Sequence, residues 1–403
     1  MEITRRDSLA ALLAATAIAA RPAIGHAGVP DVVIGAPNSL TGGFGELGTR
    51  DAWGFVMAAE HINRTGGIKS LGGAKLRVLV ADTSTDNPAQ GASVARRMLD
   101  QDKATMLYGA TASAITMAIQ VISEQARVPL LTTSYVDAVV GRGLKYTFKT
   151  TALGSQLWNF AMDGLVQMMT AVEGKPPASC GIFMGSDAVS MAVSKSLPIE
   201  AKRIGLPVVA HVNFQGNLTD ASVVISPILR YKPATIFLSA FLQDAVLILK
   251  ALRGLGIKTP VAAAGGVSSD SAGKAMGAAA DRVFMPWSWN WDLPVPGESE
   301  VLAMYKQLHP HEPYPPNDEQ LGMGYAGGLI CAQAFEKAAS REGEKLRAAL
   351  ARTTFTGLPI PARVVKFGAN GLNQDAALVL AEWHGGNAHT VWPKELQAMK
   401  PVI

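Results

Sequence analysis

The chain has 403 residues, of which 48% are hydrophobic and 17% charged, enough for two lobes with packed cores. This composition excludes a disordered, collagen-like or coiled-coil protein. The 36 basic and 32 acidic side chains leave a net charge of +4 without any basic run, so the charge gives no support to nucleic-acid binding. Cys180 and Cys331 have no cysteine or histidine at ligand spacing, and we expect buried free thiols.

The first 27 residues have the pattern of a cleaved export signal. Arg5 and Arg6 precede an apolar run over residues 9–20, and Gly25-His26-Ala27 offers small residues for cleavage. That run is shorter than the roughly 20 residues of a spanning helix, which makes a permanent membrane anchor the weaker alternative. The arginine pair resembles the twin-arginine address, although Ser8 departs from that motif and leaves general secretion open. We expect a soluble, periplasmic chain that starts near Gly28.

From Val32 onward, short β-rich runs alternate with amphipathic stretches, which is the spacing of βα units and a parallel sheet. We predict strands at 32–36, 76–81, 105–108 and 130–132, with helices at 51–63, 88–101 and 111–126. Asn87 is the expected N-cap of the second of these helices, because Pro88 suits its first position.

A second alternating set follows and predicts a second α/β lobe. Its expected strands are 179–183, 208–214, 235–239 and 261–264, and its expected helices are 155–172, 187–204, 220–232 and 243–255. Residues 146–151 and 282–286 have the pattern of extended connections. Helical periodicity returns at 299–308 and 321–352, and the tail has strand-like runs at 363–367 and 377–382.

An ordered series of motifs runs through both sets. It comprises VIGAPNSLTGGF at 33–44, AAEHIN at 58–63 with GGI at 66–68, the runs 76–82, 86–88, 109–113, 128–130 and 146–151, the strand ending at Ser239 and the helix starting at Tyr325. This series resembles the type I periplasmic solute-binding proteins of branched-chain-amino-acid-type ABC importers. The resemblance covers nearly all of the chain beyond the export signal.

The resemblance implies two Rossmann-like lobes joined by three crossovers near residues 149, 285 and 355. Lobe one would then be 28–149 plus 286–354, and lobe two 150–285 plus 355–403. The ligand would bind between the lobes, where strands end, a position that open α/β sheets favour on physical grounds. Hinge closure would present the small organic solute to a membrane permease, with no catalytic step, cofactor or metal.

The resemblance also implies which residues bind the ligand. Phe44 would pack on its side chain, and Ser113 with the backbone N–H groups of residues 111–113 would hold its carboxylate. A helix N-terminus attracts an anion in any case, and a plain N-cap is the alternative role for Ser113. The full set is Phe44, Thr111, Ala112, Ser113, Ser134, Tyr135, Val136, Gln156, Phe241, Gln243, Gly265 and Trp287.

Three tryptophans alternate in a proline-flanked stretch, at positions 287, 289 and 291, and on a strand they would share one face. Two interpretations stay open. The tryptophans cover a lobe core, or one of them, Trp287, forms a wall of the cleft. In the second case Trp287 would join Phe44, Tyr135 and Phe241 as a flat apolar surface.

Two positions depart from the amino-acid binders of this family. In those proteins a hydroxyl and a carboxylate hold the ligand ammonium, and the alignment places Val136 and Gly265 there. An enclosed ammonium without a counter-charge costs several kcal/mol. We therefore predict an aromatic or aliphatic carboxylate or amide as ligand, with Asp137, Asp244 or Asp270 as alternative sources of the missing carboxylate.

Other classes of protein have weaker support. Residues 43–48 match G-x-G-x-x-G, but Asp82 lies well beyond the roughly 20 residues expected for a ribose-binding acid. No G-x-S-x-G elbow supports a hydrolase. The histidines of the proline- and glycine-rich turns lack a third metal ligand, and we expect them to be solvated: His309, His311, His384 and His389. A ligand sensor that acts on a membrane kinase is the remaining alternative.

Overall fold

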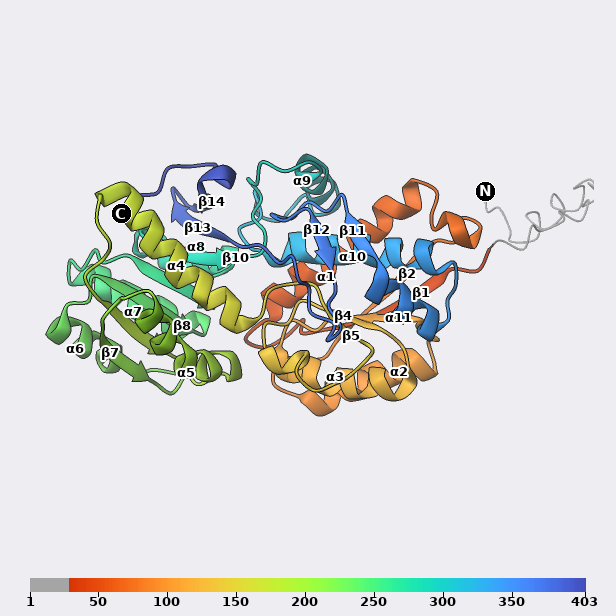
Figure 1. Cartoon of the computed structure of the whole chain (residues 1–403), viewed down its shortest axis with the longest axis horizontal. Helices are drawn as coiled ribbons and strands as arrows, with labels where there is room; N and C mark the ends of the chain where they lie inside the picture. Colours follow the sequence, from red (N-terminus) through yellow and green to blue (C-terminus); the bar gives the residue numbers. More distant parts are fainter. Residues whose placement is uncertain (1–28) are drawn as a thin grey trace, which may run out of the picture.

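The computed structural model describes residues 29–403, which form two α/β lobes along the long axis of the molecule (Figure 1). The predicted export signal, its cleavage point and Gly28 lie outside the described residues. Within residues 29–403, none of the helices combines the length and apolar character of a membrane span.

Lobe one contains a parallel sheet of five strands in the order β2-β1-β3-β4-β5. The strands are β1 (Val32–Asn38), β2 (Leu76–Asp82), β3 (Met106–Tyr108), β4 (Leu130–Thr132) and β5 (Thr147–Lys149). The helices of this lobe are α1 (Gly45–Arg64), α2 (Pro88–Asp100), α3 (Ser113–Ala126), α9 (Glu298–Leu308), α10 (Gln320–Ala338) and α11 (Gly343–Arg352). Side chains alternate across the sheet: Tyr108 packs with α1 and α10, whereas Leu107 packs with α2 and α3.

Lobe two contains a sheet of seven strands in the order β14-β13-β10-β9-β8-β6-β7. The strands are β6 (Cys180–Met184), β7 (Val208–Asn213), β8 (Thr235–Ala240), β9 (Val261–Gly265), β10 (Val283–Trp287), β13 (Val379–His384) and β14 (Asn387–Trp392). The helices are α4 (Gly154–Glu173), α5 (Ala188–Arg203), α6 (Ser222–Tyr231), α7 (Leu242–Gly254) and α8 (Asp270–Met276). β13 pairs antiparallel with both β10 and β14, and the other strand pairs described in this sheet are parallel.

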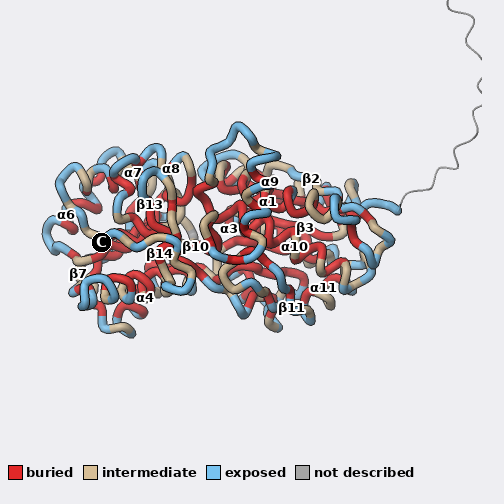
Figure 2. The backbone as a smooth tube through the Cα atoms, turned by 90° about the horizontal axis from the view of Figure 1, so that it is seen from above, coloured by how far each residue is buried: buried red, intermediate tan, exposed pale blue. Residues whose placement is uncertain are grey.

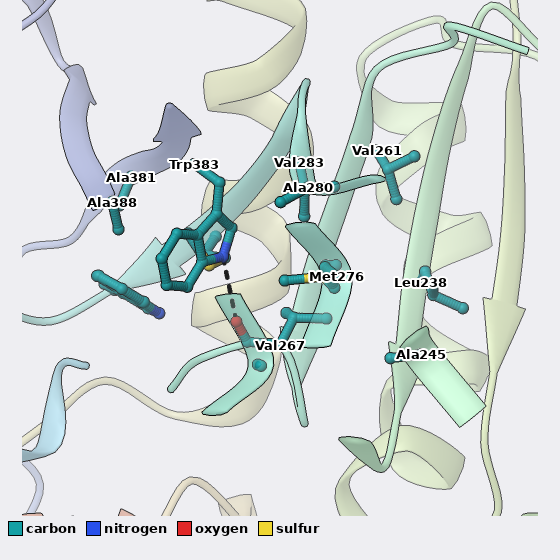
Figure 3. Packing of buried hydrophobic residues seen from close by; sticks show 14 of the residues in the cluster. Leu238, Ala245, Val261, Val267, Met276, Ala280, Val283, Ala381, Trp383 and Ala388 are labelled. Carbon is teal, nitrogen blue, oxygen red and sulfur yellow. Dashed lines mark hydrogen bonds between the residues drawn. The ribbon is translucent and has the colours of Figure 1, made fainter. Parts of the chain in front are cut away.

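Buried residues fill the interior of each lobe, and exposed residues form its surface (Figure 2). Figure 3 shows one part of the lobe-two core, where Trp383 packs against Met276 and its indole N–H donates to the carbonyl oxygen of Val267 at 3.3 Å. The described residues also contain four short 3-10 segments: Lys69–Leu71, Asp137–Val139, Gly277–Ala280 and Lys394–Leu396.

Most predicted elements lie where the sequence places them, and the differences have local causes. The first helix begins at Gly45 rather than at residue 51. The expected connection 282–286 is β10, because it pairs with β9 and β13 inside the lobe-two sheet. The helical stretch 321–352 is two helices, α10 and α11, because Ala339 adopts a left-handed backbone with φ of 44°.

The third crossover differs from the expected position near residue 355. Strands β11 (Thr354–Thr356) and β12 (Val364–Lys366) form a hairpin whose residues Phe355, Val365 and Phe367 pack in the lobe-one core. The chain enters the lobe-two sheet only at β13. The predicted lobe boundary at 354/355 is therefore wrong, because apolar side chains hold the hairpin to lobe one.

Both cysteines are buried and free, as expected: Cys180 lies in β6 and Cys331 in α10. The solvated state expected for the histidines is wrong for two of them. His309 stacks on Trp53 with ring centroids 3.9 Å apart, and His389 Nδ1 lies 3.1 Å from Asp292 Oδ2. In the described part of the chain, no group of three or more His, Cys, Asp and Glu side chains has a metal-binding arrangement.

Asn87 caps α2 as predicted, since its side-chain oxygen accepts from the backbone N–H of Gln90 at 3.1 Å. Asn87→Ala is expected to lower the free energy of unfolding by about 1 kcal/mol, because that N–H loses its acceptor. Urea denaturation measures the change, and Asn87→Asp, which keeps the cap, serves as the control. An alanine variant as stable as the wild type would contradict the cap.

Glu382 on β13 predicts a pH-dependent stability. Burial raises its pKa from the usual 4.5 to about 7, and its neighbours are Asp281, Arg282 and the backbone N–H of Val402. The stability that this group contributes is complete below pH 4.5 and is lost as the pH rises through 7. Glu382→Gln is therefore expected to match the wild type at acid pH and to exceed it at pH 8.5 by up to about 3 kcal/mol.

Thermal and urea unfolding across this pH range measures that difference. Glu344→Gln is the control, and its effect on stability is expected to have the opposite sign. Hydrogen bonds from Arg347 and Tyr146 lower the pKa of Glu344 to about 2, so the ionised form of Glu344 stabilises the fold. That variant is expected to be less stable than the wild type at neutral pH. A Glu382→Gln curve parallel to the wild-type curve would show that Glu382 ionises normally.

Candidate ligand-binding cleft

A cavity of about 280 Å³ lies between the two lobes. Lobe one contributes the loops after β1, β2, β3 and β4 and the start of α10, and lobe two contributes α4, the start of α5 and the ends of β8, β9 and β10. The cavity is thus at the carboxyl ends of parallel strands, where open α/β sheets bind ligands. The predicted residues that line it are Phe44, Thr111, Ala112, Ser113, Tyr135, Phe241 and Gly265.

Five other predicted residues lie outside this lining: Ser134, Val136, Gln156, Gln243 and Trp287. Ser134 is buried behind it, with its hydroxyl 3.0 Å from the hydroxyl of Ser113. Val136 lines a separate small pocket beside α4 and α5. Gln156 is exposed, and its side chain accepts from the backbone N–H of Leu153 at 2.9 Å at the start of α4. Gln243 is exposed on α7.

Trp287 does not form a wall of the cavity, which corrects the interpretation that placed it there. Its side chain is fully buried in the lobe-two core, and its indole N–H donates to the Ser268 hydroxyl at 3.0 Å. Because Ser268 lines the cavity, Trp287 supports the lining from behind. Trp289 is also fully buried, so the alternation of tryptophans reflects core packing.

The N-terminus of α3 faces the cavity without a side-chain cap. The helix begins at Ser113, and its N-cap is Ala112, whose methyl group accepts no hydrogen bond. Ser113 is therefore the first helical residue and not the N-cap. The first backbone N–H groups of a helix have no partner within the helix and attract an anion. Beside them, the hydroxyl of Thr111 is buried and unpartnered among the described residues.

Aromatic and aliphatic side chains from both lobes form most of the remaining walls. Phe44 in lobe one and Phe241 in lobe two face each other, with ring centroids 5.7 Å apart. Tyr135 and Trp158 add two further rings, and Leu157 lies beside the second. These rings provide flat apolar surfaces on both sides of a ligand.

No lysine, arginine or histidine side chain lines this cavity among the residues described, whereas three carboxylates do: Asp86, Asp187 and Glu319. Asp187 caps α5, accepting from the backbone N–H groups of Val189 at 3.1 Å and Ser190 at 3.0 Å. An Asp between a strand and a helix is a typical N-cap, so the sequence pattern could have predicted that Asp187 lies at this end of the strand. Asp86 is exposed at the end of the loop after β2.

The three acids proposed as alternative sources of a carboxylate lie outside the lining. Asp137 accepts from the backbone N–H of Ser155 at 3.2 Å, and Asp244 from that of Leu218 at 2.8 Å. Asp270 is 3.1 Å from the guanidinium of Arg50.

Glu319 lies just before α10 and lines the cavity next to Ser288, the residue that follows β10. Its Oε2 accepts from the Tyr135 hydroxyl and from the backbone N–H of Ser288, both at 2.7 Å. Burial raises the pKa of Glu319 to about 7. Nearby, burial lowers the pKa of Lys149, whose ammonium donates to the carbonyl of Ser134 and to the Thr151 hydroxyl at 2.8 Å. No local sequence pattern indicated Glu319, because the crossover after β10 brings it to the cavity.

The fold and the cavity define the class: a two-lobed α/β protein with a ligand-sized space between its lobes. The family described as periplasmic binding protein matches residues 31–387, and the chain belongs to that family. Leu/Ile/Val-binding protein homolog 8 of Brucella abortus is 26% identical over 386 residues, which cover 93% of each chain. The resemblance recognised in the motifs is thus confirmed.

Solved structures of low sequence identity share the fold. The branched-chain amino acid transporter substrate-binding protein LivJ of Streptococcus pneumoniae, in complex with isoleucine, aligns with a TM-score of 0.76 and 20% identity over 90% of this chain and 100% of that chain. An ABC transporter solute-binding protein of R. palustris, in complex with benzoate, aligns with a TM-score of 0.73 and 16% identity over 92% and 99%.

Proposed function

We propose that this protein captures a small carboxylate or amide with an apolar, preferentially aromatic, body outside the cytoplasm and delivers it to the permease of an ABC importer. The observation that carries the proposal is the uncapped N-terminus of α3 between aromatic walls of both lobes. The helix terminus provides N–H donors and a favourable dipole for the anionic or carbonyl head. The rings bury the body, and release follows opening of the lobes, without a chemical step.

The surroundings of two of the three lining carboxylates support a ligand without an ammonium group. Gly265 has a φ of 82°, a conformation that strains any residue with a side chain, so the end of β9 presents no carboxylate. Both oxygens of Asp187 are occupied by cap bonds to α5. Burial favours the neutral form of Glu319. Of the lining carboxylates, only the exposed Asp86 at the end of the loop after β2 is therefore free to pair with an ammonium.

The family membership and the predicted export signal support the extracytoplasmic location. The two complexes above span the ligand alternatives, because one neighbour holds isoleucine and the other benzoate. An importer receptor of this kind binds with a dissociation constant of about 1 μM or lower, roughly 8 kcal/mol.

A thermal-shift and calorimetry panel tests the proposal with benzoate, benzamide, hexanoate, leucine and isoleucine. A ligand that binds only the folded state raises the unfolding midpoint. At a free ligand concentration of one hundred times the dissociation constant, the free energy of unfolding increases by about 2.7 kcal/mol. We expect benzoate or benzamide to raise the midpoint and the two amino acids to leave it unchanged. Tight binding of leucine would show that the protein is an amino-acid receptor. If none of the five compounds binds, the alternative of a ligand sensor that acts on a membrane kinase would be favoured.

A further inference from the structure

Glu319 has one carboxyl oxygen that the protein uses and one that it leaves free. Its Oε2 accepts two hydrogen bonds, from the Tyr135 hydroxyl and from the backbone N–H of Ser288, both at 2.7 Å. Its Oε1 takes part in no hydrogen bond among the described residues, and it is not one of the unpartnered side-chain oxygens that lack accessible surface. Because Glu319 lines the cavity, Oε1 is the oxygen of this carboxyl that is left for a ligand.

This division between the two oxygens suits a neutral carboxyl group. The carbonyl oxygen of a carboxylic acid accepts hydrogen bonds, whereas its protonated oxygen donates one. Because Oε2 accepts from both protein donors, the proton of the neutral form belongs on Oε1. The surroundings agree with this assignment, since burial raises the pKa of Glu319 to about 7.

The charged groups around Glu319 give its carboxylate no ion-pair partner among the described residues. Lys149 of β5 favours the ionised form of Glu319 only from a distance, and burial lowers the pKa of this ammonium to about 7. Asp318 acts in the opposite direction, because a second negative charge raises the pKa of Glu319. The remaining titratable or charged groups near Glu319 or its immediate neighbours are Tyr135, Arg50, Asp51, Asp86 and Asp187.

An anionic ligand makes the protonation state of Glu319 decisive. No basic side chain lines the cavity among the residues described, so an ionised Glu319 would place two negative charges in one cavity of about 280 Å³. Like charges that share a buried site disfavour each other, and one of the groups takes up a proton from the solvent. A protonated Glu319 removes this repulsion and offers the ligand an O–H donor.

We propose that the protein binds the carboxylate of its ligand together with one proton, which Oε1 of Glu319 holds. This inference rests on the proposed function and adds the protonation state of its binding site. An organic acid is therefore captured more tightly in a mildly acidic medium than in an alkaline one. A neutral amide brings no charge into the cavity, so its binding depends little on this proton.

Calorimetry of the full protein between pH 6 and pH 9 tests the proposal, with benzoate and hexanoate as anions and benzamide as the neutral probe. Both acids stay ionised over this range, so a change in their affinity comes from the protein. We expect the dissociation constant of the acid that binds to rise by about 10- to 100-fold from pH 6 to pH 9, because ionisation of Glu319 competes with binding. At pH 8, titrations in phosphate and in Tris buffer are expected to show the uptake of about one proton per bound anion.

The variant Glu319→Gln keeps the shape of the side chain but cannot ionise. Its amide oxygen can accept from Tyr135 and Ser288, and its amide N–H group replaces the protonated Oε1 as donor. We expect this variant to bind the acid at pH 9 as tightly as the wild type does at pH 6, without proton uptake. Glu382→Gln is the matched control and is expected to keep the wild-type pH dependence of binding. Burial raises the pKa of Glu382 to about 7 as well, but this residue lies outside the cavity lining.

The outcomes separate this inference from the proposed function. An acid that binds equally well at pH 6 and pH 9, without proton uptake, overturns the inference and leaves the function intact. A pH dependence that persists in Glu319→Gln would assign the proton to another group such as Lys149, and it also overturns the inference. The same holds if benzamide shows an equal pH dependence, or if benzamide alone binds. Failure of all three probes to bind at any pH contradicts the proposed function itself.

Discussion

Replacing Gly54 with alanine is expected to lower the free energy of unfolding by about 3 kcal/mol or more. Gly54 lies in α1, where a Cβ atom would stand 1.9 Å from the carbonyl oxygen of Leu321 and 2.8 Å from the backbone nitrogen of Tyr325. Both contacts are backbone atoms of α10, so relief requires the two helices to separate. Because α10 starts at the cavity, its displacement would also move Gln320, which lines the cavity.

Urea denaturation measures this loss, and Gly254→Ala near the end of α7 is the matched control. A Cβ atom there meets no heavy atom within 4 Å. Alanine is the better helix former, so this variant is expected to be neutral or more stable by up to about 1 kcal/mol. A Gly54→Ala protein within about 0.5 kcal/mol of the wild type would contradict the close packing of α1 on α10.

Replacing Phe241 with alanine is expected to weaken the binding of benzoate by about 10- to 100-fold. Phe241 lines the cavity at the start of α7 in lobe two, and its ring faces Phe44 of lobe one. Truncation removes apolar surface from the ligand and an aromatic contact between the lobes. Because the Phe241 side chain is only half-buried, the unliganded protein is expected to unfold at nearly the wild-type midpoint.

Calorimetry of Phe241→Ala, Phe44→Ala and the double variant separates the two contributions. If the rings act together when the lobes close, the combined loss of binding free energy is smaller than the sum of the single losses. Tyr231→Ala on α6 is the control, because this residue is 47% exposed and lies outside the cavity lining. Unchanged benzoate affinity in Phe241→Ala would remove this ring from the proposed binding site.

The sequence by itself determined the alternation of strands and helices, and with it the fold class. The run that became β4 was located to the residue, and Asn87 with Pro88 located the start of α2. These features depend on neighbours along the chain: the length of apolar runs, their periodicity and the residues that cap a helix. The motif series identified the family because it too consists of short stretches of sequence, which occur in a fixed order along the chain.

The cavity could be predicted only in part. Loops that directly follow strands, such as those bearing Phe44, Ser113 and Phe241, end at the cleft because the carboxyl ends of parallel strands meet there. For Gln156 and Gln243, proximity in sequence to such a loop was not enough, because each side chain points away on its helix and is exposed.

Only the tertiary structure decided which side chains complete the site. The crossover after β10 carries Gln320 to the cavity from more than a hundred residues beyond the lobe-one strands. Trp287 packs in the lobe-two core and therefore does not reach the cavity. The hairpin that contains Phe355 packs in the lobe-one core. The physical reason is common to all three: membership of a cavity or a core depends on contacts between segments distant in sequence, which local propensity does not encode.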